Sequence, residues 1–195
     1  FKFLLNADWI VPSSREDITQ DNVWNEWLRE ELPALYTDAL VHLRQLFADD
    51  EGDGLEDVVD VAWSVLRYLP LEGEVLGWFR QTSNKIVQQM RLSECMLTAQ
   101  NKWVLPGEVV YCRDQVIGRL VDEQMLHDTL KLYYLNPHLL HQLPQALLYT
   151  LGVQPLNARH LIRVMEELTA AGPAPPPGWT AWLKKLEDDT WVARW

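Results

Sequence analysis

Apolar residues in the first half of the chain recur mostly at helical spacing. The pattern predicts a short helix over residues 23–31 and a longer helix that restarts at Leu32-Pro33, where proline is tolerated in a first turn. A third helix is predicted from Leu55 to Leu69, ended by Pro70, and a fourth over residues 74–90. These stretches predict a mainly helical first half.

Two regions depart from helical spacing. Residues 1–11 carry apolar side chains at both odd and even positions, as in a strand covered on both faces, and Pro12 ends this stretch. Residues 95–117 change to short apolar runs around a turn, which predicts a small β-hairpin region. The chain is therefore expected to contain a minor β component.

The second half returns to helices. A helix is predicted from Asp122 through Tyr133, a short one from Leu143-Pro144 to a left-handed cap at Gly152, and a longer one capped by Asn157. Residues 172–178 form a proline-rich spacer, and residues 179–195 predict a final helix. The predicted fold class is mainly α with a small β component, α+β.

Composition and charge limit the possible partners. The 195 residues are 48% hydrophobic and 23% charged, which is typical of a globular protein, and the net charge is −11. Such an acidic surface repels phosphate backbones and anionic lipids, so neither nucleic acid nor a membrane is expected as a partner. Protein partners are expected, and the sequence gives no indication of oligomeric state.

The cysteine count bears on location. Two cysteines are too few for a disulfide framework, and no stretch has the pattern of a secretory signal or a membrane span. An intracellular location, cytoplasmic or nuclear, is therefore expected. The chain begins at Phe1 without a methionine, which suggests a piece of a longer protein.

An acidic run between two predicted helices is a weak candidate for a calcium loop. Its carboxylates follow EF-hand spacing at Asp49, Glu51, Asp53, Asp57 and Asp60. Glu51 crowds a tight loop, and Asp60 is too short to replace the usual bidentate glutamate. A solvated acidic linker is the favoured alternative, so no metal is predicted.

A second candidate follows the first predicted strand. Ser13 and Glu16 have the spacing of a capping box, which predicts a structural role. Arg15 is not needed for the cap, and its guanidinium could hold a carboxylate or a phosphate in a bidentate manner. An ordinary ion pair is the competing interpretation.

Other motifs are incomplete. His138 and His141 lack further metal ligands, and Cys112 has no spaced partner for thiolate catalysis. Residues 143–167 have helix-turn-helix spacing, but the acidic chain favours packing in a core over DNA binding. The sequence contains no complete active site, so no catalytic residue is assigned.

The opening stretch resembles a known family. FLLNADWIVPSSREDI (Phe3 to Ile18), followed by WNEWL (Trp24 to Leu28), is similar to the segment that closes the ATPase-like domain of the sacsin and No Vein group. Y-L-P-x-x-G-E from Tyr68 to Glu74, W-V-L-P from Trp103 and L-G-V from Leu151 extend the resemblance to about residue 172.

The resemblance implies a fold and a function. That family carries an N-terminal domain of the GHKL type, the type of heat-shock chaperones and histidine kinases. Residues 1–20 would be the closing strand and cap of such a domain, and residues 21–171 the helical region after it. ATP and magnesium would be held upstream of this chain, and Arg15 would be the one residue here positioned to sense nucleotide state.

The predicted function is thus that of a non-catalytic fragment of a chaperone-like, ATPase-related protein, which couples nucleotide state to protein contacts. Trp24, Trp27, Trp78 and Trp103 are expected to pack helices onto the small sheet. The alternatives are a stand-alone protein interaction module and, less favoured, a helix-turn-helix DNA binder.

Overall fold

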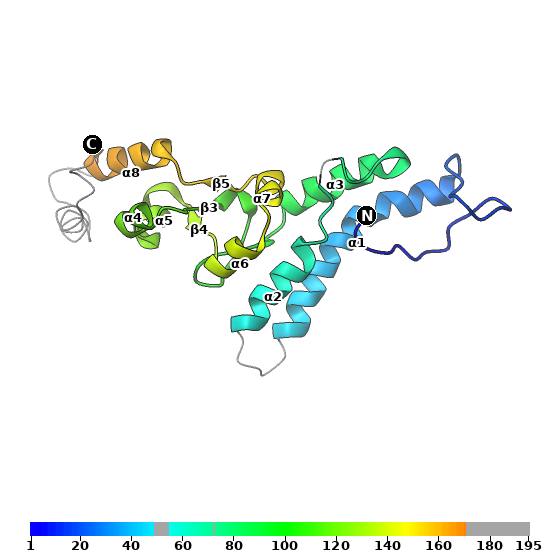
Figure 1. The fold of residues 1–195 in the computed structure, drawn as a ribbon, viewed down its shortest axis with the longest axis horizontal. Helices are drawn as coiled ribbons and strands as arrows, with labels where there is room; N and C mark the ends of the chain where they lie inside the picture. Colours follow the sequence, from blue (N-terminus) through cyan, green and yellow to red (C-terminus); the bar gives the residue numbers. More distant parts are fainter. Residues whose placement is uncertain (49–54, 72, 171–195) are drawn as a thin grey trace.

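The protein is an elongated, mainly helical molecule with two small sheets near its middle (Figure 1). The computed structural model describes residues 1–48, 55–71 and 73–170. The predicted α+β class with mostly helix is confirmed. The predicted spacer over residues 172–178 and the helix over residues 179–195 lie outside the described residues.

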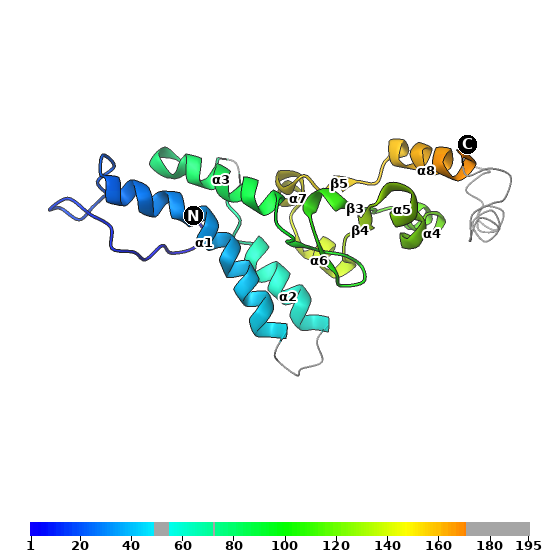
Figure 2. The same ribbon diagram turned by 180° about the vertical axis from the view of Figure 1, so that it is seen from behind.

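Three helices form one half of the molecule. They are α1 (Val23–Ala48), α2 (Leu55–Leu66) and α3 (Arg80–Arg91), and a short 3-10 turn, η1 (Gly77–Phe79), precedes α3. The views from both sides show the second half of α1 beside α2, both projecting away from the long axis (Figure 2).

Two predicted helix boundaries were wrong. The break at Leu32-Pro33 is absent, because α1 continues through Pro33 and both residues are buried against their neighbours. Proline at this position removes the hydrogen bond to the Arg29 carbonyl, and the burial offsets that loss. The helix predicted over residues 74–90 begins only at Arg80, since Gly77 has a left-handed φ of 64°.

The first sheet is the predicted hairpin. Strands β1 (Met96–Leu97) and β2 (Trp103–Val104) pair antiparallel, with Met96 opposite Val104. Because each strand has two residues, the hairpin depends on side-chain packing more than on its ladder.

The second sheet was not predicted. Strand β3 (Val109–Tyr111), which follows the turn η2 (Pro106–Glu108), lies between β4 (Tyr133–Tyr134) and β5 (Gln154–Pro155), and both neighbours run parallel to it. The helix predicted through Tyr133 therefore ends earlier.

Five further helices complete the described chain: α4 (Gln115–Leu120), α5 (Glu123–Leu130), α6 (Pro137–Gln142), α7 (Gln145–Leu151) and α8 (Ala158–Ala170). Two predicted ends are confirmed. Gly152 ends α7 with φ at 88°, and the Asn157 side chain accepts a hydrogen bond from the Arg159 N–H at 3.0 Å at the start of α8.

The interior consists of two clusters that meet at β3. Val109 and Tyr111 point into a large cluster that includes side chains of α1, α2, α3, α6 and α7. Val110, on the opposite face of the strand, belongs to a smaller cluster with α5 and α8. Successive side chains of a strand face opposite ways, so one strand contributes to both clusters.

This division corrects the helix-turn-helix interpretation. Leu147 and Leu148 of α7 are buried in the large cluster, whereas Val164 and Leu168 of α8 are buried in the small one. Strand β5 lies between the two helices along the chain. They therefore do not form the compact pair that reads a DNA groove.

Two neighbouring residues of α7 test the large cluster. Leu148 is 0% exposed and Tyr149 is 84% exposed. Leu148→Ala is expected to lower the free energy of unfolding by about 2–5 kcal/mol, because it leaves a cavity among packed side chains. Tyr149→Ala should change it by less than about 0.5 kcal/mol. Urea unfolding followed by circular dichroism measures both, and equal effects would contradict the assigned core.

Candidate functional site

Residues 1–22, here called the N-terminal arm, run beside the first half of α1 and turn back at the end of the molecule (Figure 1). The strand predicted over residues 1–11 is absent, because no described strand lies beside the arm to complete a ladder. Its apolar side chains instead pack on helices: Phe1 and Trp9 lie edge-on to Phe79, with ring centroids 5.6 and 5.9 Å away.

The buried side chain of Asn25 fastens the arm to α1. Its Oδ1 accepts a hydrogen bond from the Ile10 N–H at 2.8 Å, and its Nδ2 donates to the carbonyls of Ile10 at 2.7 Å and Thr19 at 2.8 Å. The Thr19 N–H also donates to the Ile10 carbonyl at 3.1 Å. Asn25 is 0% exposed, and this arrangement satisfies its oxygen and both amide hydrogens. One side chain thus closes the loop between Ile10 and Thr19.

The two tryptophans beside Asn25 face outward, contrary to the packing role predicted for them. Trp24 is 45% and Trp27 is 50% exposed, and their ring centroids are 5.1 Å apart. Each residue of a helix turns by about 100°, so both side chains point away from the face that carries Asn25. The Trp24 Nε1 donates to the Asp8 carbonyl at 2.9 Å, which gives the arm a second attachment.

The predicted capping box is not formed. No helix begins at Ser13. Residues 12–15 instead form a turn, in which the Arg15 N–H donates to the Pro12 carbonyl at 2.9 Å. Arg15 has a φ of 56°, in the left-handed region that a helix start cannot use. The cap of α1 is Asn22, whose Oδ1 accepts from the Trp24 N–H at 3.0 Å.

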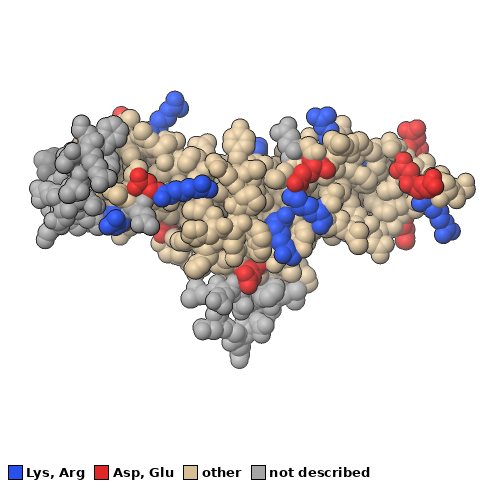
Figure 3. Space-filling view, in the orientation of Figure 1, with Lys and Arg blue, Asp and Glu red and all other residues tan. Residues whose placement is uncertain are grey.

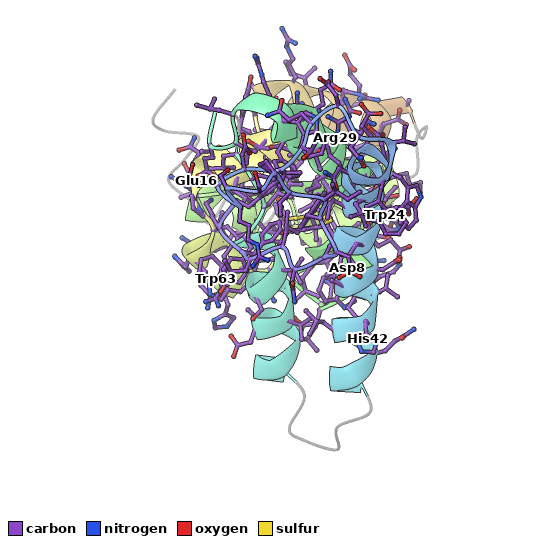
Figure 4. The ribbon with its side chains drawn as sticks, turned by 90° about the vertical axis from the view of Figure 1, so that its right-hand side faces the viewer. Asp8, Glu16, Trp24, Arg29, His42 and Trp63 are labelled. Carbon is purple, nitrogen blue, oxygen red and sulfur yellow. The ribbon has the colours of Figure 1, made fainter. Side chains whose placement is uncertain are left out.

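The residues at the end of the arm are spread over its surface. Ser13, Arg15 and Glu16 are all exposed. In the view along the molecule, Glu16 and Trp24 lie on opposite sides of this end, and Asp8 lies on the side of Trp24 (Figure 4). The structure therefore does not bring Arg15 and the tryptophans into one enclosed site.

The start of the arm is held by an ion pair. The Lys2 Nζ lies 3.0 Å from Glu74 Oε1, and the Leu71 N–H donates to Glu74 Oε2 at 2.9 Å. Burial alone would raise the pKa of Glu74, but the hydrogen bond from Leu71 and the charge of Lys2 outweigh it and hold that pKa below its usual range.

An apolar cavity of about 460 Å³ lies beneath the arm. It is lined by Phe1, Phe3 and Leu5 of the arm, and by residues of α1, α2 and α3 that include Tyr36 and Val65. The Tyr36 hydroxyl donates to the Val65 carbonyl at 2.7 Å, and burial raises the pKa of Tyr36. The arm thus rests on the helices without filling the space below it.

Trp78 and Trp103 contact arginines of α1. The Arg29 guanidinium lies 4.5 Å from the centre of the Trp78 ring, and that of Arg44 lies 4.6 Å from the centre of Trp103. Trp103, in β2, is partly buried against the large cluster. One helix therefore contacts both the turn before α3 and the hairpin.

A polar cluster around α5 was not predicted from the sequence. Glu123 and His127 lie one turn apart; Glu123 contacts Gln100, and the His127 ring stacks on Tyr133 at 4.5 Å. Among the described residues, Glu123 Oε1 and His127 Nδ1 have no hydrogen-bond partner. Burial raises the pKa of Glu123 against the opposing effect of the Gln100 hydrogen bond. The spacing of four residues was the only sequence signal for this pair.

Little in the described chain supports a metal site. Asp49, Glu51 and Asp53 of the calcium candidate lie outside the described residues, while Asp57 and Asp60 belong to α2. Within residues 1–48, 55–71 and 73–170, no three potential ligands cluster.

Neither the paired histidines nor the thiols form a reactive centre. His138, on α6, lines a polar pocket of about 540 Å³ with Asn101 and Asn136. Burial raises the pKa of the Cys95 thiol to about 12 and also raises that of Cys112. Both thiols are therefore protonated at neutral pH.

None of the helices in the described ranges combines the length and the apolar character that a bilayer crossing requires.

Comparison with known proteins finds a similarity to part of a No Vein protein. The chain is 30% identical over 172 residues to Protein NO VEIN of Arabidopsis thaliana. The match covers 86% of this chain and 6% of that protein, so the chain spans only a small part of its relative. The predicted resemblance to No Vein proteins is thereby supported, whereas the link to sacsin and to GHKL domains stays a prediction. No family model matches the sequence, and no solved structure matches it significantly.

The hydrogen bonds of Asn25 give a first test of this site. Asn25→Ala would leave the Ile10 N–H and the Thr19 carbonyl without their side-chain partner, which is expected to cost about 1–3 kcal/mol locally. Hydrogen exchange should speed up at the amides of residues 8–20 while α7 stays protected. Gln20→Ala, at an exposed position, is the matched control, and unchanged exchange in Asn25→Ala would contradict the clamp.

The ion pair of Lys2 and Glu74 predicts a dependence on pH. Because folding lowers the pKa of Glu74, its stabilising effect is complete above the ordinary glutamate pKa of about 4.3 and is lost as pH falls through the lower, folded value. NMR titration should show the signals of Phe1 and Phe3 shifting with protonation of Glu74. In Glu74→Gln this acid-induced shift should disappear; its persistence would assign it to another group.

Proposed function

We propose that this chain is a non-catalytic segment of a NO VEIN-like, ATPase-related protein, and that it couples the nucleotide state of that protein to its contacts with other proteins. ATP and magnesium would be bound by residues upstream of the arm. The chaperone-like character and the intracellular location, cytoplasmic or nuclear, belong to the same proposal. The similarity to Protein NO VEIN supports the family part of it.

The attachment of the arm to α1 is the observation that carries the proposal. The arm is held at separate points, by Asn25, by the bond from Trp24 to Asp8 and by the pair of Lys2 and Glu74, with a cavity beneath part of it. Such a segment would transmit a movement of the chain before it through these attachments. A displacement of the arm would act directly on the start of α1.

Helix α1 would carry this displacement through the molecule. Its 26 residues extend over about 39 Å, from the clamp at Asn25 toward the hairpin. Arg44, near its other end, packs on Trp103 of β2 and donates to the Glu94 carbonyl at 3.0 Å. A rotation or shift of α1 would therefore displace the hairpin and the surface around it.

Arg15 would be the contact between arm and nucleotide domain. It lies at the exposed turn of the arm, and among the described residues its side chain has no hydrogen-bond or ion-pair partner. A guanidinium held in this way is available to a phosphate or a carboxylate of an adjoining domain.

Nucleotide-dependent hydrogen exchange in the longer protein tests the proposal. A non-hydrolysable ATP analogue, compared with ADP, should change exchange in peptides covering residues 6–28. Arg15→Ala should reduce that difference by at least about tenfold if the arginine contributes a charge-assisted contact. Arg163→Ala, on an exposed position of α8, is the matched control and should preserve it.

Two results would contradict this function. One is identical exchange of residues 6–28 in both nucleotide states. The other is phosphate release from ATP by the isolated 195-residue chain, since that would require an active site within it.

A stand-alone interaction module is the second candidate function. It is favoured by the half-exposed Trp24 and Trp27, because large aromatic side chains at a surface are enriched in protein interfaces. The separation of α7 from α8 between two clusters gives no support to the DNA-binding alternative.

A further inference from the structure

The outward face at the start of α1 carries an unusual combination of side chains. Trp24 and Trp27 lie together there, and Val23, one helical turn before Trp27, is 83% exposed. We call these three residues the aromatic patch. Trp27 makes no hydrogen bond within the described structure, so no polar contact there accounts for its exposed position.

Helical geometry explains why these rings remain outside. Asn25 must point inward to reach Ile10 and Thr19, which fixes the rotation of α1 about its axis. Trp24 and Trp27 then lie on the far side of the helix and cannot join the large cluster. The two rings are exposed because the hydrogen bonds of Asn25 fix the rotation of α1, and not because the core is loosely packed.

The end of the molecule that carries the aromatic patch is acidic. Six carboxylates of the arm and the first turns of α1 have no ion-pair partner among the described residues: Asp8, Glu16, Asp17, Asp21, Glu26 and Glu31. Figure 3 shows acidic atoms collected at this end of the visible face.

The nearby positive charge is mostly engaged elsewhere. Arg29 packs on Trp78 and contacts Glu30, and its side chain is only 15% exposed. Lys85 pairs with Glu30 of α1. Glu31 lies one helical turn after Trp27, so its carboxylate is a neighbour of that ring.

Aromatic faces beside unpaired carboxylates fit one kind of partner. A guanidinium or an ammonium gains from stacking on a tryptophan face and from pairing with an adjacent carboxylate. Apolar side chains between such cations would cover Val23. Anionic ligands would meet repulsion from the same carboxylates.

We propose that the aromatic patch binds a cationic segment of a protein partner, in which arginine or lysine side chains are interspersed with apolar ones. Arginine is favoured, because its planar guanidinium both stacks and pairs in a bidentate manner. Binding at this surface requires no nucleotide, so its success or failure is independent of the coupling proposed above.

A labelled peptide that alternates arginine with leucine provides the test. Fluorescence anisotropy with the 195-residue chain should show saturable binding at low salt that weakens as salt is added. Trp27→Ala should weaken binding by about tenfold or more, as for a central aromatic of an interface. Trp27→Phe should retain part of the affinity, which separates loss of the ring from loss of folding.

Two controls distinguish the patch from general attraction to an acidic protein. Tyr149→Ala removes an exposed aromatic of α7 and should leave binding unchanged. Glu31→Lys should weaken it more than Glu166→Lys, which makes the same change of charge on α8. A peptide that alternates glutamate with leucine should not bind.

Three outcomes would overturn the proposal. They are an absence of binding at low salt, equal affinity in Trp27→Ala and the unchanged chain, and equal weakening by the two charge reversals. The last would show that net charge alone attracts the peptide.

Discussion

The pairing of one buried amide with one peptide group organises this end of the molecule. Asn25 presents to Ile10 the acceptor and the donor that a neighbouring strand would present, and it uses its second hydrogen on Thr19. A segment without a sheet thus obtains the backbone partners that burial requires. Because the amide must face inward, it also determines the direction of every other side chain in the first turns of α1.

From that constraint follow the two features on which the functional argument rests. The arm is attached by hydrogen bonds, an ion pair and ring contacts, with a cavity under part of it, and the proposed coupling starts from these attachments. The tryptophans on either side of Asn25 are directed to solvent, where they meet carboxylates without partners. The short sequence WNEWL therefore combines an inward clamp with an outward surface.

Sequence reasoning succeeded where a structure is determined by local chemistry. The caps at Gly152 and Asn157 and the hairpin within residues 95–117 follow from residues close together in the chain. Strands β4 and β5 were missed because two residues are too few to show a period. Their pairing with β3 depends on contacts between distant parts of the chain.

The candidate site was predicted less well than the fold. Apolar residues at both odd and even positions are typical of a strand covered on both faces. They are equally typical of an extended arm packed on helices, and only tertiary contacts distinguish the two structures. Trp24 and Trp27 were assigned to the core from their size, whereas the hydrogen bonds of Asn25 decide which way they face. The turn at Arg15 was obscured by a capping pattern, since Ser13 and Glu16 have the right spacing in the wrong backbone conformation.

Insertions and deletions just before strand β3 should disturb the packing more than apolar substitutions within the strand. Val109 and Tyr111 are buried in the large cluster, and Val110 is buried in the small one. Adjacent residues of β3 therefore pack in different clusters. Loss or gain of a single residue just before β3 would exchange these assignments and place each side chain in the space shaped for its neighbour. Apolar residues of similar size could replace these side chains, but an insertion or deletion immediately before Val109 would disturb both clusters at once.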